Sequence, residues 1–159
     1  MAQRIEMETT KGPVTIELRP DLAPGHVARI TELAEAGEYD GVAFHRVIDG
    51  FMAQTGDVKH GKEGANASMA GTGGSSKPDL RAEFSKEPHV RGTCSMARSS
   101  APNSANSQFF ICFGDAGFLD GQYTVWGKVT DGMDNVDKIK RGEPVTDPDR
   151  IVSMKVVDG

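Results

Sequence analysis

An arginine lies close in sequence to an aromatic ring, a thioether and an amide in the stretch FHRVIDGFMAQTGD, residues 44–57. Alternation predicts a strand with Phe44 and Arg46 on one side and His45 on the other, followed by a turn at the Asp-Gly pair. The returning strand would carry three potential neighbours of the arginine: Phe51, Met52 and Gln54. Because a guanidinium is always charged and holds its N–H donors in a rigid fork, this hairpin could present a fixed cationic donor beside an apolar surface. This stretch alone leaves open the alternative of an ordinary hairpin with Arg46 in solvent.

A second stretch, residues 95–128, reads SMARSSAPNSANSQFFICFGDAGFLDGQYTVWGK. Its SMA, SQFFI, FLDG and VWGK motifs, together with FHRVIDGFMAQTGD, resemble the cyclophilin family of peptidyl-prolyl cis-trans isomerases in order and approximate spacing. LAPGHVARITELAEAGEYDG, residues 22–41, is similar to the first helix of that family and the turn after it, and DGMDNVDKI, residues 131–139, is similar to its second helix. The resemblance covers nearly the whole chain and is weakest over residues 58–88.

The resemblance implies a role for each part of these motifs. Arg46 matches the catalytic arginine, which would stabilise the twisted amide during rotation about an X–Pro bond. The walls of a proline pocket match four apolar residues, for each of which ordinary core packing is the alternative: Phe51, Met52, Phe110 and Leu119. Gln54 and Gln108 would hold the substrate backbone and steady the arginine. Ala97 and Arg98 match a groove floor that pairs with the peptide main chain.

Some positions depart from the family pattern. Phe118 stands where many members have a tryptophan, and Tyr123 where many eukaryotic members have a histidine, although we expect both to contact substrate. Trp126, the lone tryptophan, falls at a strand position that is usually a buried phenylalanine. RSSAPNSANSQFF, residues 98–110, resembles the bacterial form of its loop. Because phenylalanine has no N–H donor, we expect only weak binding of cyclosporin A, which the resemblance implies would fill the proline pocket.

Composition describes a soluble globular protein of 159 residues, 37% of them hydrophobic and 26% charged, which we interpret as one domain spanning 1–159. A net charge of −5 argues against nucleic-acid binding, and no apolar run is long enough to cross a membrane. The absence of an apolar signal region and of a CxxC pair predicts a cytoplasmic protein with Cys94 and Cys112 as reduced thiols. His60 and His89 lack partners at metal-ligand spacing, so we expect them to be solvated. We expect a monomer without metal or cofactor.

Short strands dominate the predicted secondary structure, at residues 4–9, 14–18, 93–98, 109–113, 124–129 and 151–157. Pro24 begins a predicted helix that ends near Gly37, with an apolar stripe at helical spacing: Val27, Ile30, Leu33 and Ala34. A second helix is predicted at 133–140, and a Gly-rich surface loop at 58–88. This pattern predicts an antiparallel barrel. The resemblance implies a mainly β fold: a closed eight-stranded antiparallel β-barrel, filled by large inward side chains and capped by two α-helices.

These observations predict a prolyl isomerase that acts on proline-containing peptides and on unfolded or folding proteins, and so assists protein folding. One alternative is a non-catalytic module or chaperone that uses the same groove to bind proline-containing partners. Arg46 favours catalysis over this alternative, since binding alone would not require it. A second alternative, a carrier of a small ligand inside the barrel, is disfavoured by the size of the inward residues. His45 is interpreted as structural, because alternation points it away from Arg46.

Overall fold

The computed structural model describes residues 3–62, 71–143 and 145–158. Its main feature is one antiparallel sheet of eight strands in the order β3-β4-β6-β5-β7-β2-β1-β8. The strands are β1 Gln3–Thr9, β2 Gly12–Leu18, β3 Arg46–Ile48, β4 Met52–Thr55, β5 Thr93–Met96, β6 Phe109–Cys112, β7 Val125–Asp131 and β8 Ile151–Asp158. The helical elements are α1 Pro24–Glu35, the 3₁₀ turn η2 Gly117–Leu119 and α2 Met133–Val136. The predicted mainly β, eight-stranded antiparallel architecture is therefore confirmed.

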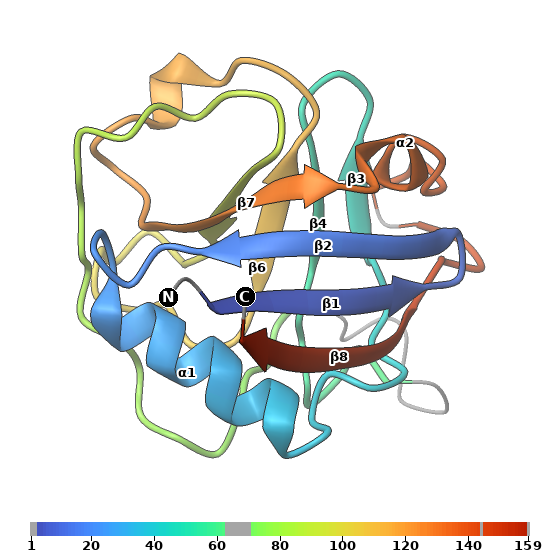
Figure 1. Ribbon diagram of the computed structural model, residues 1–159, viewed down its shortest axis with the longest axis horizontal. Helices are drawn as coiled ribbons and strands as arrows, with labels where there is room; N and C mark the ends of the chain where they lie inside the picture. The colour runs from blue at the N-terminus through green and yellow to red at the C-terminus, as the bar shows by residue number, and fades with distance from the viewer. Residues whose placement is uncertain (1–2, 63–70, 144, 159) are drawn as a thin grey trace.

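The sheet curls round on itself (Figure 1), and its two edge strands are β3 and β8. No ladder pairs these two strands in the described part of the chain, so the expectation of a fully closed barrel was slightly wrong. The gap is spanned by isolated bridges, Val47 with Gly142 and Ala43 with Arg150. The physical reason is that the short strand β3 gives its outer backbone hydrogen bonds to the segment before β8 instead of to β8 itself: Val47 and Gly142 exchange two bonds of 2.8 Å.

Aromatic rings fill the interior of the curled sheet. Trp126, at 0% exposure, meets Phe109 edge-to-face with ring centroids 5.2 Å apart, and Tyr39 meets the same Phe109 at 5.7 Å. Phe44 lies in this core as well, together with Val47. The sequence had predicted Phe44 on the side of Arg46. That prediction was wrong because β3 begins only at Arg46, so strand alternation does not extend back to Phe44.

The two helices lie toward opposite ends of the molecule (Figure 1). α1 begins at Pro24 and buries the predicted stripe, and Gly37 follows with φ of +73°, the left-handed conformation that glycine adopts without strain. α2 is shorter than the predicted 133–140. Beyond Val136 the chain continues in tighter turns, such as the bond from Ile139 N to Val136 O, which still bury Ile139.

The N-terminus of α1 is capped from a distant segment. Ala23, at the N-cap position, has no side-chain acceptor, but Glu83 accepts hydrogen bonds from the backbone N–H groups of Gly25 at 3.2 Å and His26 at 2.9 Å. Glu83 also contacts the buried His26 ring at Nδ1, 2.6 Å away. Glu83 lies in the predicted loop 58–88, whose described part, 58–62 and 71–88, contains no helix or named strand. This loop segment therefore stabilises the helix that it crosses.

Candidate active site

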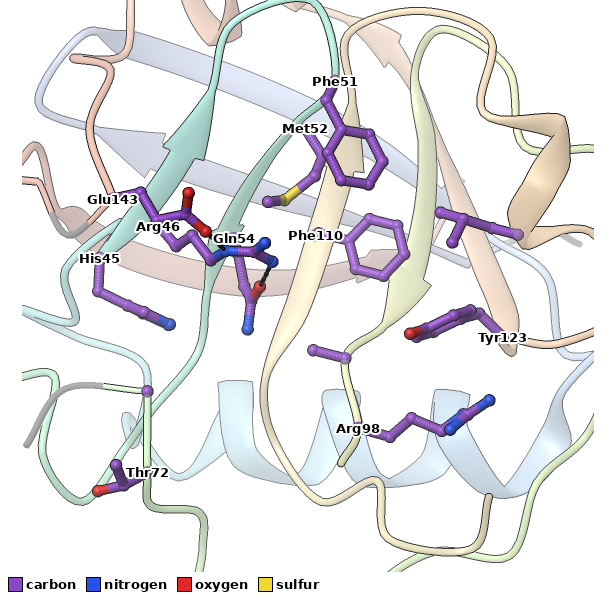
Figure 2. Close-up of a pocket in the computed structure, with 13 residues that line it drawn as sticks. His45, Arg46, Phe51, Met52, Gln54, Thr72, Arg98, Phe110, Tyr123 and Glu143 are labelled. Carbon is purple, nitrogen blue, oxygen red and sulfur yellow. Dashed lines mark hydrogen bonds and ion pairs between the residues drawn. The ribbon is translucent and has the colours of Figure 1, made fainter. Parts of the chain in front are cut away.

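A surface pocket of about 370 Å³ lies over β3, β4 and β6, between the loop at 71–72 and the η2 turn (Figure 2). Charged and amide side chains occupy one end, and aromatic and aliphatic side chains the other. Its lining consists of His45, Arg46, Phe51, Met52, Gln54, Gly71, Thr72, Ala97, Arg98, Phe110, Leu119, Tyr123 and Glu143. The structure thus brings together most residues that the sequence analysis assigned to a site.

Strand register places the central side chains of the pocket in one row. Arg46 on β3 is directly opposite Gln54 on β4, and Gln54 is directly opposite Phe110 on β6. Residues directly opposite each other in antiparallel strands point to the same face of the sheet, so these three side chains are neighbours across it. The hairpin turn positions Phe51 at the pocket edge, since Gly50 takes a φ of +74° and Phe51 precedes the returning strand instead of starting it.

The Arg46 guanidinium is held at two of its nitrogens. Nε donates to Glu143 Oε2 at 2.6 Å, and Nη1 donates to Gln54 Oε1 at 3.4 Å. The Arg46 side chain is 40% exposed, so its charge faces the open end of the pocket. Figure 2 shows the guanidinium between Glu143 and the Gln54 amide. The geometry presents a cationic donor of fixed orientation beside the apolar part of the pocket.

Two amides continue this hydrogen-bond chain away from the arginine. Gln54 Nε2 donates to Gln108 Oε1 at 3.0 Å, and Gln108 Nε2 donates to the carbonyl oxygens of Gly71 and Gly73, both at 2.9 Å. Each amide oxygen accepts and each amide nitrogen donates, so every orientation in the chain is consistent with the next. Gln108 borders an adjoining hollow of about 710 Å³ instead of the first pocket. These hydrogen bonds link Arg46 to the loop at 71–73, which forms one rim of the pocket.

The apolar end of the pocket is built from three almost fully buried side chains and two partly buried ones. Met52, Phe110 and Leu119 belong to a cluster of their own, separate from the core inside the sheet, and Phe51 and Tyr123 pack against it. Phe110 and Tyr123 meet edge-to-face, with ring centroids 5.8 Å apart. A rigid aromatic and thioether surface of this kind matches a small apolar ring in area and shape.

The Arg98 guanidinium is hydrogen-bonded to backbone carbonyl groups of the protein. Its Nε and Nη2 donate to Gln122 O at 3.1 and 2.7 Å, and its charge lies 4.5 Å above the Tyr123 ring. The neighbouring Ala97 N–H donates to Gln108 O at 3.0 Å. Arg98 therefore braces Tyr123 and the floor of the groove.

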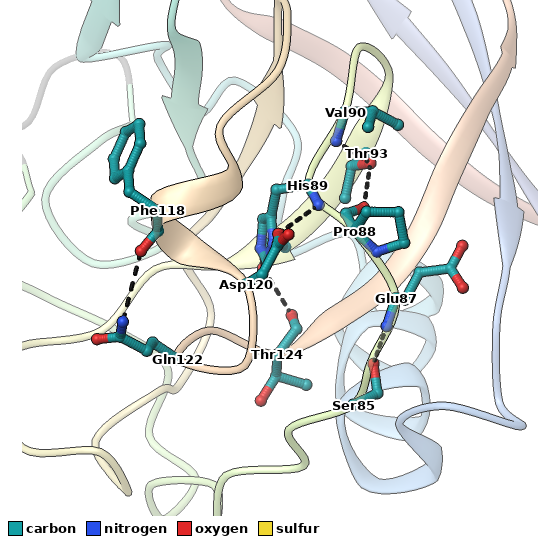
Figure 3. Close-up of polar contacts among 11 residues, drawn as sticks. Ser85, Glu87, Pro88, His89, Val90, Thr93, Phe118, Asp120, Gln122 and Thr124 are labelled. Carbon is teal, nitrogen blue, oxygen red and sulfur yellow. Dashed lines mark hydrogen bonds and ion pairs between the residues drawn. The ribbon is translucent and has the colours of Figure 1, made fainter.

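Phe118 lies outside the pocket lining. Its side chain is exposed (Figure 3), with 67% of the residue accessible, and its ring centroid is 5.5 Å from that of Phe51. The two rings extend the apolar surface beyond the rim. Phe118 can therefore contact a ligand larger than the pocket, but it does not wall the pocket itself.

His45 departs from the position that alternation predicted. The ring is buried and lines the same pocket as Arg46, under Gly71, where an added Cβ would come within 3.0 Å of His45 Nε2. Among the described residues Nδ1 has no hydrogen-bond partner. Burial lowers the pKa of His45, with the Asp57 charge opposing that shift. His45 separates the loop at Gly71 from the strand that carries Arg46.

His89 was predicted to be solvated, and this prediction was wrong. The residue is 1% exposed, with Nδ1 3.0 Å from Asp120 Oδ1 and Nε2 2.9 Å from Ser95 Oγ (Figure 3). Its ring stacks on Phe110 at a centroid distance of 6.2 Å. Burial lowers the pKa of His89, although Asp120 opposes the shift. His89 therefore supports the pocket wall from behind.

Asp57 and Glu143 are two further residues that the sequence analysis did not single out. Buried Asp57 accepts four backbone N–H bonds and so holds the loop at 71–73 against the pocket. Burial opposes ionisation of this carboxyl, but the four N–H bonds outweigh that effect and lower its pKa. The GD that ends the first motif contains Asp57, whereas no local pattern marks Glu143.

Cys94 and Cys112 are free and buried, as predicted, and burial raises the pKa of both thiols. Over residues 3–62, 71–143 and 145–158, no group of three or more His, Cys, Asp or Glu side chains is placed to hold a metal ion. None of the helices in that part of the chain has the length and apolar character needed to span a membrane.

Comparison with known proteins identifies the family. The profile of the cyclophilin type peptidyl-prolyl cis-trans isomerase/CLD family matches residues 4–156. A probable peptidyl-prolyl cis-trans isomerase of Brucella suis is 63% identical over 152 residues, which cover 91% of this chain and 78% of that relative. The chain therefore belongs to the cyclophilin family, and it is a peptidyl-prolyl cis-trans isomerase.

Solved structures agree with this family assignment. The cyclophilin AquaCyp293 from Hirschia baltica matches with a TM-score of 0.82 and 32% identity, over 95% of this chain and 72% of that one. A Cryptosporidium parvum cyclophilin, solved in the presence of the dipeptide Ala-Pro, matches with a TM-score of 0.84 and 25% identity, over 98% of this chain and 99% of that one.

Proposed function

We propose that Arg46 is the catalytic residue, and that it accelerates rotation about X–Pro bonds by stabilising the twisted amide. The observation that carries this proposal is a guanidinium held in a fixed orientation at the edge of a buried apolar surface. Conjugation in the amide gives the uncatalysed rotation a barrier of about 18–20 kcal/mol. Exchange therefore takes roughly tens to hundreds of seconds. No bond is made or broken, so the reaction needs no nucleophile.

The chemistry follows from what changes during the rotation. In the twisted state the prolyl nitrogen loses conjugation and gains a lone pair, so an N–H donor aimed at that nitrogen binds more strongly midway than at either planar end. An acceleration of about a millionfold requires about 8 kcal/mol of such differential stabilisation. One charge-assisted hydrogen bond contributes about 1.5–3 kcal/mol. The remainder is assigned to preorganisation, in which Glu143 and Gln54 hold the arginine and the apolar walls hold the proline.

We assign the proline ring to the surface formed by Phe51, Met52, Phe110 and Leu119. These side chains offer apolar area next to the guanidinium, and the dipeptide Ala-Pro was present with the related Cryptosporidium parvum cyclophilin. The pocket is open at the surface, where the lining residues Arg46 and Glu143 are exposed, so peptides and unfolded segments of proteins are the substrates that we infer. Assistance to folding chains whose proline isomerisation is slow would follow from this activity.

The test is a protease-coupled isomerisation assay on an X–Pro tetrapeptide. Arg46→Ala should lower kcat/KM about tenfold to a thousandfold, or about 1.4–4 kcal/mol, with unchanged thermal stability. Arg46→Lys should fail nearly as badly, because a single ammonium cannot reproduce the planar fork. Wild-type activity should be nearly constant from about pH 6 to 9 and indifferent to EDTA, since the proposed mechanism uses no general acid, general base or metal. A fully active Arg46→Ala protein would refute the assignment. Retained peptide binding without turnover in this variant would separate catalysis from a binding-only role.

A further inference from the structure

We infer that Glu143 is a positioning residue for the reaction: its carboxylate fixes the orientation of the Arg46 guanidinium, an inference that rests on the proposed role of Arg46. The contact is short, 2.6 Å from Arg46 Nε to Glu143 Oε2. It joins residues 97 positions apart in the sequence. Glu143 also lines the pocket, so its carboxylate lies at the arginine end of the site (Figure 2).

Glu143 can orient the guanidinium because it binds a different nitrogen of Arg46 from the one that Gln54 binds. Glu143 takes Nε, and Gln54 takes one hydrogen of Nη1. Two bonds at different nitrogens fix a planar group both in tilt and in rotation about its long axis. Nη2 is then the nitrogen that we assign to the substrate. Without Glu143, the single 3.4 Å bond to Gln54 would leave the guanidinium free to swing about Nη1.

The backbone around Glu143 is attached to the strand that carries Arg46. On one side of Glu143, Gly142 exchanges two hydrogen bonds with Val47, each of 2.8 Å. On the other side, Val145 N donates to His45 O at 3.0 Å. Val47 and His45 are the neighbours of Arg46 in the chain. The carboxylate therefore comes from a segment whose backbone is hydrogen-bonded to both chain neighbours of Arg46, which distinguishes the contact from one made by a loosely held surface loop.

The solvent exposure of the Arg46–Glu143 ion pair indicates whether the pair affects stability or turnover. The Glu143 side chain is 58% exposed and that of Arg46 40%. Ion pairs in such surroundings contribute little to folding, because water and salt screen them. Loss of Glu143 should therefore leave stability unchanged and act on turnover, where the orientation of a donor matters most.

The experiment measures kcat/KM and unfolding of Glu143→Ala, Glu143→Gln, Arg46→Ala and the double variant. Glu143→Ala should lose about threefold to tenfold in kcat/KM with unchanged melting temperature. Glu143→Gln should retain most activity, because its amide oxygen can accept the same hydrogen bond from Arg46 Nε. On the Arg46→Ala background, removal of Glu143 should change nothing further. Asp21→Ala is the matched control, since it removes a surface ion pair with Arg19 at 2.9 Å, and neither residue lines the pocket.

Each other outcome overturns the inference. Activity of Glu143→Ala within about twofold of wild type, with Arg46→Ala impaired, would refute the positioning role and leave the role of Arg46 intact. The same loss from Glu143→Ala in both backgrounds would show that it acts on something other than Arg46. A gain in activity would show that the carboxylate competes with substrate. Full activity of Arg46→Ala would refute the proposed function and this inference together.

Discussion

Replacement of Glu83 by alanine should destabilise the protein without touching its active site. Glu83 is the acceptor for the first free N–H groups of α1, at Gly25 and His26, and the partner of the buried His26 ring. Loss of a helix cap costs about 0.5–2 kcal/mol. The His26 ring would then have both nitrogens unpaired, since Nε2 already has no partner among the described residues, and a buried polar group left unsatisfied costs about 1–3 kcal/mol.

The two contributions together predict a loss of about 1.5–5 kcal/mol in the free energy of unfolding. Urea denaturation at pH 7.5, followed by the fluorescence of the buried Trp126, measures it. Glu87→Ala is the matched control, because Glu87 lies on the same segment and its carboxylate contacts only the surface side chain Arg19 in the described structure. The control should change stability by less than about 1 kcal/mol. A Glu83→Ala protein as stable as the control would refute the capping argument, and both proteins should keep wild-type kcat/KM.

Two further predictions concern pH and inhibition. Burial lowers the pKa of His26, His45 and His89, so the unfolded chain takes up protons below about pH 6.5 that the folded chain does not. Urea midpoints should therefore fall between pH 7 and pH 5.5, and a constant midpoint would contradict the burial of these rings. Phe118→Trp should strengthen inhibition by cyclosporin A about tenfold to hundredfold, because a buried carbonyl without a donor costs about 1–3 kcal/mol. A titration that finds equal nanomolar inhibition of both proteins would show that Phe118 does not face the drug.

Local patterns in the sequence predicted the parts of the site that depend on strand pairing. The hairpin that carries Arg46 and Gln54 follows from alternation and an Asp-Gly turn, and register then places Phe110 beside them. Most of the strands and the start of α1 were also predictable, because each depends on neighbours in sequence, whereas the burial of Trp126 was implied by the family resemblance. The extent of α2 was not, because the tight turns after Val136 bury the same face as a helix would.

Contacts between distant segments could not be predicted in the same way. A histidine in a polar segment gives no sign of burial, and His89 is buried only because Asp120 and Ser95 supply partners for both of its nitrogens. Glu143 is one of many acidic residues on the chain until the backbone of its segment pairs with β3. The opening between the edge strands β3 and β8 was also not predicted, since the number of strands does not determine whether the two edge strands pair.

Asp57 anchors two segments of the chain beside the pocket with one carboxylate. Its Oδ1 accepts the N–H groups of Lys59 and His60, and its Oδ2 those of Gly71 and Gly73, so one carboxylate holds the chain on both sides of residues 63–70. Substitution of Asp57 should therefore release both segments together, because both anchor points depend on the same side chain.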